Sequence, residues 1–572
     1  MDRRNFLIKS AIAGVGISAL TNNIISAPTI FTESRTRINT EKGKILFKPY
    51  IVQNGKGPHL GRIKSFKNIG PEDWDFPSWA FASDTEWDAF YSNIFVDDNG
   101  VSISDAAGKD KFGINVRWNV EGFGYIYMTA DNGGEYYSLP QGGKELKYNL
   151  NYELAKSRIV ANNNRVKKFA NSGYTPNSEV KAFLDLSDEF LDNATRANND
   201  ELKRAQYAQK GLYYAMHAGE MLELDKAWFD IARTKYREDF FLGCDTEDWK
   251  EMDHNLFMDL FSETFNYATI TYYLNGFQPT EGQYNWNRTD EKFKELRKRG
   301  IKVEGRPLFW ADECCCPKWL TSKSYPEILK YAEKFTKDMV SHYGDEMYAW
   351  EIINEAHDFD NILKLKPDQM VEVAKLIAET AKSVNPKVHR LINNCCIQAD
   401  YIQIIDWDRF DSKFPLVTPH QFIKMCYEAG VDFTLTGQQL YYQYSNRDLA
   451  DIIRMMERLE KFGKPVQVTE IGTTSGCNCH NKKDGWEDTS MPDVPYTWHR
   501  HWDEDLQAEW MEKIYTLHYS KPWVEAINWY DQVDGYSFIK NGGILSSTDG
   551  TKKEVYNKFT ELRKKWKEAA KG

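Results

Sequence analysis

Internal repeats and low-complexity tracts are absent from the 572-residue sequence, and no stripe of lysine or arginine runs along it. The formal net charge is −11 and the isoelectric point is near 5.6. A polyanionic partner such as nucleic acid requires a basic surface, so this composition argues against one. No stretch approaches the roughly 20 apolar residues that a membrane-spanning helix needs. We therefore expect neither a nucleic-acid partner nor a membrane span.

Aromatic residues, by contrast, are abundant. The chain has 18 Trp and 32 Tyr, and 41% of its residues are hydrophobic. An aromatic ring offers a flat apolar face and a polar edge, as stacking on a sugar ring requires. The alternative is that these rings fill hydrophobic cores, of which a chain of this length can form two or three.

The first residues read MDRRNFLIKSAIAGVGISAL, in which Arg3 and Arg4 precede a modest apolar run over residues 11–20. This pattern resembles a twin-arginine export signal, although Asp2 stands where a hydroxyl-bearing residue is usual. A cytoplasmic amphipathic helix is the alternative interpretation. We expect an export signal over residues 1–28 and a periplasmic or extracellular mature protein.

The first region after this signal alternates apolar and polar residues in short runs broken by Gly, Asn and Asp, as in FGINVRWNVEGFGYIYMTADNGG. Such period-two runs predict an antiparallel β-sandwich over residues 44–170, with the alternation continuing to about residue 166. This domain is either a carbohydrate-binding domain or a packing partner for the rest of the chain. Four tryptophans are candidate sugar platforms if they are exposed: Trp74, Trp79, Trp87 and Trp118.

A helical connector is predicted over residues 175–237, where apolar residues recur at helical spacing with almost no Gly or Pro. From residue 238 to 572, strand-like segments alternate with amphipathic helical ones. The strand candidates are FFLGCD, YATITYYL, KVEGRPLFW, YAWEIINE, HRLINN, DFTLTGQQLYY, PVQVTEI and VEAINWYDQ. Eight such alternations predict a (β/α)8 barrel. An open doubly wound sheet is the alternative, but no glycine-rich phosphate loop follows the first strand.

Two glutamates stand at the ends of predicted barrel strands. Glu355 ends the fourth strand, in WEIINE, and Glu470 ends the seventh, in VQVTE. Barrels of this kind place their chemistry at the C-terminal ends of the strands. Cleavage of a glycosidic bond needs one carboxyl group to protonate the leaving oxygen and a second to meet the anomeric carbon. The pair therefore predicts a glycosidase, whereas a single strand-end glutamate would more often be an ion-pair partner.

The residues around these glutamates resemble a known family. WEIINEA is similar to the acid/base strand W-D-V-V-N-E-A of glycoside hydrolase family 10, the family of endo-1,4-β-xylanases, and VTEIG is similar to its nucleophile strand I-T-E-L-D. FNYATITYYLNGFQPTEGQYNW resembles the stretch that holds the family's F-N-x-x-T and P-x-x-G-x-Y-N-F signatures. INWYDQVDGYSF and GGILSSTDGTKKEVYNKF resemble its last strand and final helix. The resemblance covers about 60% of the chain and implies a retaining (β/α)8 glycosidase.

The resemblance implies specific roles for five residues. Glu355 would be the general acid/base and Glu470 the nucleophile. Asn354 would hydrogen-bond the sugar 2-hydroxyl, Gln439 occupies the glutamine position of the family's G-x-Q-x-H strand, and Trp529 stands where the family keeps a tryptophan lining the pocket. A core position is the alternative for Trp529.

Several positions depart from the family pattern. Arg306 and Ala311 replace both histidines of its G-H-x-L-x-W-H motif, Tyr441 replaces the histidine that orients the nucleophile, and Gly472 replaces the aspartate behind it. The family's E-N-x-M-K-W segment is TYYLNGF here, which lacks the usual Asn and Lys. An arginine at position 306 suggests a carboxylated or sulfated sugar, because guanidinium pairs bidentately with such groups. Alternatively, Arg306 bridges a strand-end carboxylate.

Nine cysteines occur, most of them after predicted barrel strands: Cys244, Cys314, Cys315, Cys316, Cys395, Cys396, Cys426, Cys477 and Cys479. A disulfide between loops, unpaired buried thiols, and a soft-metal site that includes His480 all remain open. The segment PYTWHRHWDEDL holds Trp498, His499, His501 and Trp502, which form either an aromatic wall for sugars or an anchor for a helix that starts near Asp503.

Together these patterns predict an exported, retaining endo-β-glycosidase that hydrolyses a β-linked polysaccharide. By resemblance the bonds are 1,4-β-xylosidic, and catalysis needs no cofactor or metal ion. The alternatives are a non-catalytic glycan-binding protein and a glycosidase of the same clan with a substrate other than xylan. The expected substrate-binding residues are Asn354, Gln439, Tyr441, Arg306 and Trp529.

Overall fold

The computed structural model describes most of the chain. The described residues are 43–52, 80–97, 99–357, 361–403, 415–442, 446–476, 498–530, 532–535, 539 and 541–570. The predicted export signal lies outside them, as do Trp74, Trp79, Cys477, Cys479 and His480.

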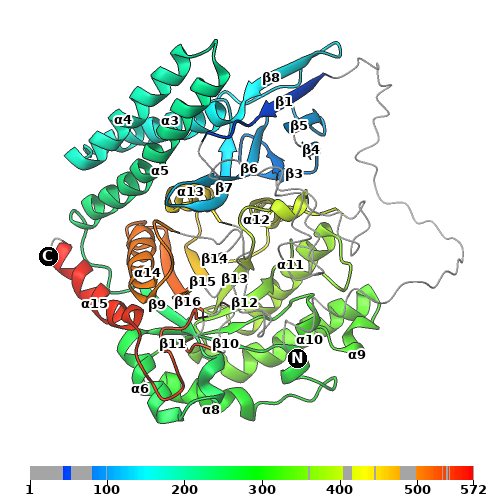
Figure 1. The fold of residues 1–572 in the computed structure, drawn as a ribbon. Helices are drawn as coiled ribbons and strands as arrows, with labels where there is room; N and C mark the ends of the chain where they lie inside the picture. The colour runs from blue at the N-terminus through cyan, green and yellow to red at the C-terminus, as the bar shows by residue number, and fades with distance from the viewer. Residues whose placement is uncertain are drawn as a thin grey trace, which may run out of the picture.

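Eight parallel strands close into a barrel in the lower half of Figure 1. They are β9 (Phe241–Asp245), β10 (Tyr267–Thr271), β11 (Lys302–Arg306), β12 (Ala349–Asn354), β13 (His389–Asn394), β14 (Leu435–Tyr441), β15 (Val466–Gly472) and β16 (Val524–Trp529). Each strand pairs with the next along the chain, and β16 pairs with β9. The (β/α)8 prediction is confirmed, and all eight strands lie where the sequence pattern placed them.

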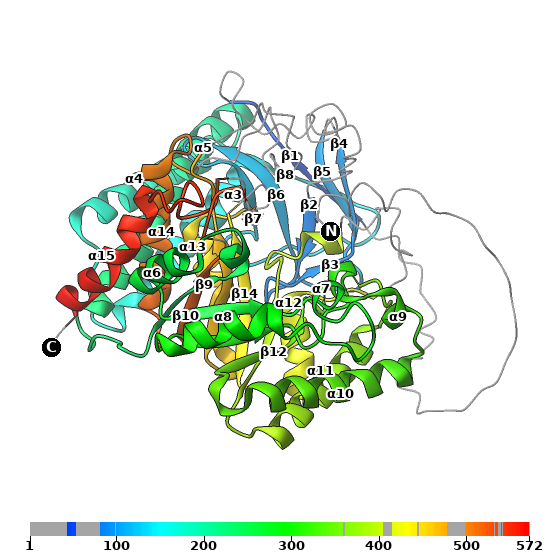
Figure 2. The same cartoon turned by 90° about the horizontal axis from the view of Figure 1, so that it is seen from below.

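A long helix follows every barrel strand, and Figure 2 shows α8, α10 and α11 outside the strands. These helices are α6 (His254–Thr264), α8 (Asn287–Lys298), α10 (Tyr325–Tyr343), α11 (Pro367–Val384), α12 (Pro419–Glu428), α13 (Leu449–Met456), α14 (Glu504–Tyr519) and α15 (Glu554–Ala569). Helix α14 is capped by Asp503, as predicted. Helix α12 opens with Pro419, which suits the first turn of a helix, and Thr418 caps it.

The barrel interior is closely packed where β11 and β12 meet. A Cβ atom at Gly305 would lie only 2.2 Å from the Trp350 ring, a distance that no real side chain tolerates. Glycine at this position therefore lets the indole of Trp350 fill the barrel, where it is fully buried. Trp350 and Asn354 belong to the same strand, so this packing helps to position the end of that strand along the barrel axis.

The N-terminal region contains two four-stranded sheets. One has the order β4 (Asn93–Asp97), β5 (Gly100–Asp105), β1 (Lys44–Lys48), β8 (Glu145–Asn149), and the other β3 (Ala89–Phe90), β2 (Ala80–Ser83), β6 (Gly113–Val120), β7 (Gly124–Ala130). The pairs are antiparallel, as predicted, except that β1 and β8 are parallel. The arrangement of the two sheets as a sandwich stays a prediction.

One N-terminal boundary differs from the prediction. Helix α3 spans Leu150–Ala170, so the segment that we expected to remain β-structured up to residue 166 is helical from residue 150 onward. No Gly or Pro separates β8 from this helix, and Asn149 ends the strand and caps the helix by accepting a hydrogen bond from the Tyr152 amide. Because no Gly or Pro marks the change, the sequence pattern did not show where the strand ends and the helix begins.

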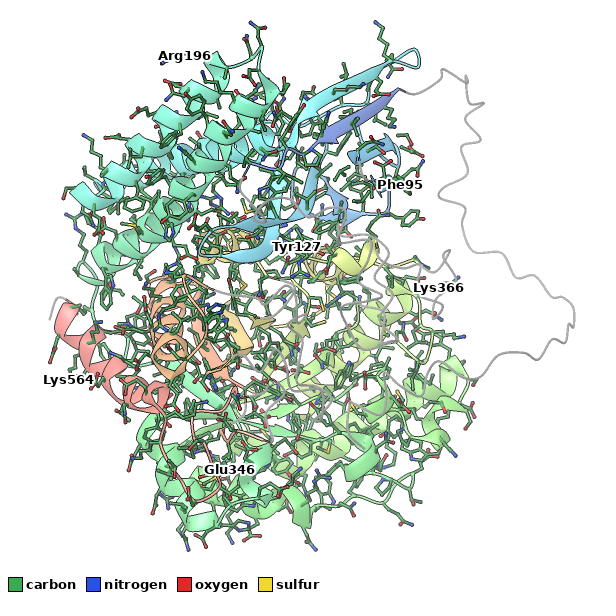
Figure 3. The ribbon with its side chains drawn as sticks, viewed as in Figure 1. Phe95, Tyr127, Arg196, Glu346, Lys366 and Lys564 are labelled. Carbon is green, nitrogen blue, oxygen red and sulfur yellow. The ribbon has the colours of Figure 1, made fainter. Side chains whose placement is uncertain are left out.

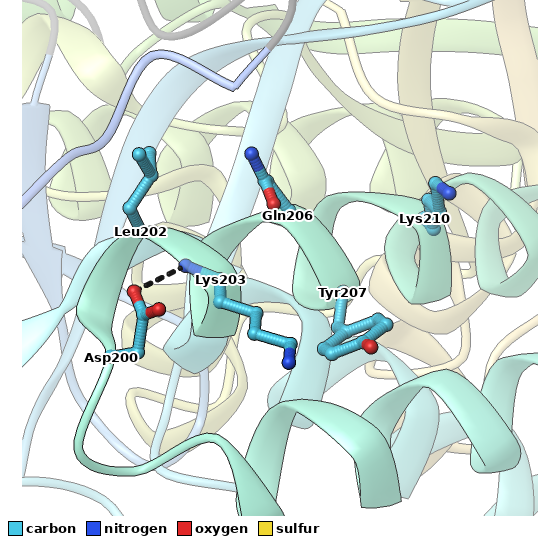
Figure 4. Close-up of a pocket in the computed structure, with 6 residues that line it drawn as sticks. All are labelled: Asp200, Leu202, Lys203, Gln206, Tyr207 and Lys210. Atoms are coloured by element: carbon cyan, nitrogen blue, oxygen red, sulfur yellow. Dashed lines mark hydrogen bonds between the residues drawn. The ribbon is translucent and has the colours of Figure 1, made fainter.

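The predicted helical connector contains α4 (Ser178–Arg196) and α5 (Glu201–Ile231). A hollow of about 390 Å³ lies at the start of α5, lined by Asp200, Leu202, Lys203, Gln206, Tyr207 and Lys210 (Figure 4). It lies on the helical layer, away from the barrel strands (Figure 1). Among the described residues, no helix is both long enough and apolar enough to cross a membrane.

The N-terminal sheets dock onto the loops that leave the C-terminal ends of β13 and β14. The backbone N–H of Tyr127 donates to the carbonyl of Asn446 (2.8 Å), and its hydroxyl donates to Asp400 (2.9 Å). Arg447 donates to Asn115 on β6 (2.7 Å). Figure 3 shows Tyr127 between the sheets and the barrel, with Glu346, which precedes β12, at the far end of the molecule. The N-terminal region therefore covers part of the rim on which the strand-end glutamates lie.

Buried ion pairs hold this contact. Arg158 on α3 pairs with Asp448 and with Asp451 (2.9 Å to the latter), and all three side chains are buried. Burial alone would lower the pKa of Arg158, but the two carboxylates outweigh it and raise the pKa well above its ordinary value. A buried charge is tolerated only when it is paired and hydrogen-bonded.

We expect Arg158→Met to destabilise the folded protein by about 3–5 kcal/mol, because it removes the buried cation paired with Asp448 and one of the three cations paired with Asp451. Urea unfolding followed by tryptophan fluorescence measures the change. Arg196→Met is the matched control, because Arg196 forms an exposed pair with Asp192 and should change stability by less than about 1 kcal/mol. Equal destabilisation by both substitutions would contradict the prediction.

Candidate active site

Glu355 follows β12 directly and lies at the C-terminal rim of the barrel. Its backbone N–H donates to the carbonyl of Asn393 at the end of β13 (3.0 Å), and its side chain is 8% exposed. Its φ of 47° lies in the left-handed region, which costs a non-glycine residue on the order of 1–3 kcal/mol. Such backbone strain is typical of functional positions, and here it turns the chain immediately after the strand.

Glu470 lies near the C-terminal end of β15, on the same rim. Its two carboxylate oxygens accept hydrogen bonds from different strands. Arg306 at the end of β11 donates to Oε1, and the Tyr441 hydroxyl at the end of β14 donates to Oε2. Charge-assisted hydrogen bonds of this kind fix a carboxylate in orientation.

Strand β14 links the two glutamates. Gln439 pairs with Glu470 in the strand register, and its side-chain amide donates to Glu355 Oε1 (2.6 Å). Tyr441, two residues further along, donates to Glu470. Both carboxyl groups therefore face one mouth, and one strand contacts each of them. The predicted positions of Glu355 and Glu470 at a common rim are confirmed.

Arg306 is occupied by protein carboxylates rather than open to solvent. Besides Glu470, it donates to Asp245 at the end of β9 (2.8 Å), and its side chain is 2% exposed. Burial alone would lower its pKa, but Glu470 and Asp245 outweigh this and raise the pKa well above its ordinary value. Of the two interpretations from the sequence, the structure favours the bridging role over recognition of a charged sugar.

Asn354 is part of a polar network beside Glu355. Its side-chain oxygen accepts a hydrogen bond from the Asn393 amide (3.1 Å), whose own oxygen accepts one from the Thr469 hydroxyl (2.5 Å). Asn354 is nearly buried, and its expected contact with a sugar hydroxyl stays a prediction. No sequence signal points to Asn393, because strand HRLINN ends in two asparagines that resemble ordinary turn residues.

Trp529 does not line the mouth. Its side chain is 0% exposed, its indole N–H donates to the carbonyl of Gly542 (2.9 Å), and its ring contacts Phe559 on α15. The residue is a core aromatic between the barrel and its helices, so its expected sugar contact is wrong. The ring of the next residue, Tyr530, lies beside the residues of the mouth instead. It is 5.3 Å from the Arg306 guanidinium and 5.6 Å from the Tyr441 ring. Period-two alternation places neighbouring side chains on opposite faces of a strand.

Two further glutamates lie inside the barrel below the mouth. Burial raises the pKa of Glu304 to about 7, and the Tyr267 hydroxyl donates to it (2.6 Å). Burial also raises the pKa of Glu351 well above its ordinary value. A protonated acid avoids the cost of a buried charge. Both buried glutamates therefore favour the protonated form more than an exposed glutamate does.

The structure also shows the contacts of four other aromatic residues that the sequence singled out. Trp118 is buried and donates to Gln209, so it is no sugar platform, whereas the Trp87 ring lies 5.6 Å from the Arg447 guanidinium. Trp498 and His499 bind Glu220 on α5, which supports an anchoring role.

The structure describes some of the cysteines for which a disulfide, free thiols and a metal site were the alternatives. Cys315, Cys316 and Cys426 are buried free thiols, and the sulfur atoms of Cys314 and Cys315 lie 3.9 Å apart. Cys477, Cys479 and His480 lie outside the described residues, so a disulfide or metal site that includes them stays a prediction.

Comparisons with known proteins agree with this geometry. The family model of glycosyl hydrolase family 10 matches residues 233–562. Endo-1,4-beta-xylanase B of Thermotoga neapolitana is 22% identical over 305 residues, which cover 51% of this chain and 77% of that protein. Endo-1,4-beta-xylanase 2 of Arabidopsis thaliana is 23% identical over 282 residues, which cover 48% of this chain but only 25% of that protein.

Among solved structures, native xylanase 10B from Thermotoga maritima is 18% identical with a TM-score of 0.45, and the match covers 60% of this chain and 98% of that one. The family model alone spans more than half of the 572 residues and contains both strand-end glutamates. The chain therefore belongs to glycosyl hydrolase family 10.

Proposed function

We propose that this protein is an exported, retaining endo-β-glycosidase that hydrolyses a β-linked polysaccharide with 1,4-β-xylosidic or similar bonds. One observation carries the proposal: β14 holds Glu355 through Gln439 and Glu470 through Tyr441, so that two carboxyl groups face one mouth. Two carboxyl groups across a barrel mouth are the minimum that glycoside hydrolysis requires. Family membership and the xylanase relatives support the same reaction.

In the first step, Glu355 donates its proton to the glycosidic oxygen while Glu470 attacks the anomeric carbon. The bond to the leaving sugar breaks, and a glycosyl ester forms on Glu470. The ester carries no negative charge, which favours the ionised form of Glu355 for the second step. Glu355 then takes a proton from water, the water oxygen attacks the anomeric carbon, and Glu470 leaves as a carboxylate.

Arg306 and Tyr441 prepare Glu470 for both steps. Their hydrogen bonds orient its two oxygens before substrate binds and stabilise the carboxylate when it leaves the ester. Burial and the neighbouring Glu470 raise the pKa of Tyr441 well above its ordinary value, so its hydroxyl remains a donor throughout the accessible pH range. Both groups act as positioning residues for the nucleophile.

The substrate shell supports a glycan that differs from plain linear xylan. The segment after β10 lacks the family's Asn and Lys, and Tyr273 lies there with its ring 5.5 Å from Trp310. The charge of Arg306 is already neutralised, so nothing at that position requires an acidic sugar. The twin-arginine pattern at the N-terminus supports export to the compartment where extracellular polysaccharides are degraded.

We expect the first-formed product to keep the β configuration, which proton NMR detects before mutarotation. Glu355→Ala should hydrolyse activated aryl glycosides only slowly, and azide should restore turnover by forming a β-glycosyl azide. Glu470→Ala should be inactive, and azide should yield no β-configured product. An inverted first product would overturn the retaining mechanism.

Tyr441→Phe should lower kcat roughly 10- to 100-fold, because a hydrogen bond to a charged group contributes about 1.5–3 kcal/mol. Tyr515→Phe is the matched control. Its hydroxyl is buried on α14 and makes no hydrogen bond among the described residues, so its loss should leave kcat within about twofold. Steady-state kinetics on one aryl glycoside compares the two, and an unchanged kcat in Tyr441→Phe would show that this bond does not aid catalysis.

On a panel of polysaccharides, release of reducing sugar should be faster from a decorated or non-xylan β-linked backbone than from linear xylan. The replaced histidines and the missing Asn and Lys are the reason. Fastest turnover on unsubstituted xylo-oligosaccharides would contradict this specificity. Binding of a glycan without any release of reducing sugar would instead favour a non-catalytic glycan-binding protein.

A further inference from the structure

Two exposed aromatic side chains lie four residues apart in the sequence of the N-terminal region. Tyr91 is 55% exposed and Phe95 is 58% exposed. Among the described residues, the only other aromatic side chain with comparable exposure is Tyr427 on α12, at 52%. Large exposed aromatic residues that gather on one element commonly mark a binding surface.

Tyr91 and Phe95 lie on the solvent-exposed side of residues 91–96, where exposed and buried side chains alternate and Ser92, Ile94 and Val96 are buried. The segment runs into β4, which lies at the edge of its sheet among the described residues. Over four residues an extended backbone advances by about 13 Å. Figure 3 shows Phe95 at the periphery of the sheets.

Polar groups stand beside these rings. Asn93 lies between them on the same side and donates from its amide to the Ser104 hydroxyl on β5 (2.8 Å). Ser102 is the register partner of Phe95 on that strand. Tyr91, Asn93 and Phe95, together with Ser102 and Ser104, are called the β4 strip below. Rings flanked by amide and hydroxyl groups match the apolar faces and hydroxyl edges of sugars.

The β4 strip is tied to the rim of the active site. Ser92, between Tyr91 and Asn93, donates from its backbone N–H (3.0 Å) and its hydroxyl (3.1 Å) to the Gln403 side chain. Gln403 belongs to the segment that follows β13, the strand whose Asn393 carbonyl accepts the Glu355 amide. The loop that follows β13 therefore holds the buried side of the segment that carries the strip.

We propose that the β4 strip binds the polysaccharide chain beyond the catalytic mouth. This rests on the proposed function, which supplies a glycan on this rim. A backbone advance of about 13 Å between the two aromatic residues suits a run of linked sugars rather than a single ring. A protein partner is disfavoured, because two rings separated by an amide offer far less than the roughly 1,200 Å² of buried surface that a stable interface needs.

The test is a Tyr91→Ala/Phe95→Ala double variant of the full chain, compared with Tyr427→Ala as a matched exposed-aromatic control. Affinity electrophoresis in gels containing linear xylan, arabinoxylan, mixed-linkage β-glucan or galactomannan measures binding, and steady-state kinetics follow on the polysaccharide that binds best. The double variant should lose retardation and raise KM for that polysaccharide roughly five- to hundredfold. Turnover of a short aryl glycoside and kcat on the polysaccharide should stay unchanged.

The ring-keeping variant Tyr91→Phe/Phe95→Tyr should retain binding. The proposal is overturned if the wild type binds none of these glycans, if the double variant binds as the Tyr427→Ala control does, or if short and long substrates are affected equally. Affinity electrophoresis requires no turnover. The β4 strip is thus tested even if the catalytic proposal fails, and the catalytic proposal is tested by the Glu355 and Glu470 variants alone.

Discussion

The ion bridge from Asp245 through Arg306 to Glu470 is the interaction on which the catalytic mouth depends. A carboxylate that is nearly buried is unstable without a cation and hydrogen-bond donors, and Arg306 supplies both to two carboxylates at once. The three residues end β9, β11 and β15, so the bridge requires the closed barrel in which β16 pairs with β9. The ion bridge at the mouth can therefore form only when the barrel closes.

Arg306 and Tyr441 stand where the family pattern has histidines, and this changes how the surroundings of Glu470 respond to pH. An imidazole changes charge near neutral pH, whereas a guanidinium stays charged, and burial together with Glu470 raises the pKa of Tyr441 well above its ordinary value. The two donors to Glu470 therefore do not titrate near neutral pH, as an imidazole would.

The N-terminal region is structurally coupled to this site. Tyr127 and Arg447 bind across the contact between the sheets and the loop after β14, and Arg158 forms buried ion pairs there. That loop leaves the strand that carries Gln439 and Tyr441, the two residues that contact Glu355 and Glu470. A buried, charge-paired contact of this kind differs from a flexible linker to an appended module. Trp87 belongs to this contact, because its ring lies 5.6 Å from the Arg447 guanidinium.

The eight barrel strands and the strand-end positions of both glutamates could be predicted from the amino-acid sequence, because period-two and helical patterns are local and a strand end is visible from its neighbours. The sequence did not determine which side of β16 faces the mouth, since both faces of a parallel barrel strand are buried and Trp529 and Tyr530 look alike in such a pattern. Nor did it determine the partners of Arg306, which lie 61 and 164 residues away in the chain. Only the tertiary structure brings such distant residues together, because their contact depends on barrel closure and not on any local preference of the chain.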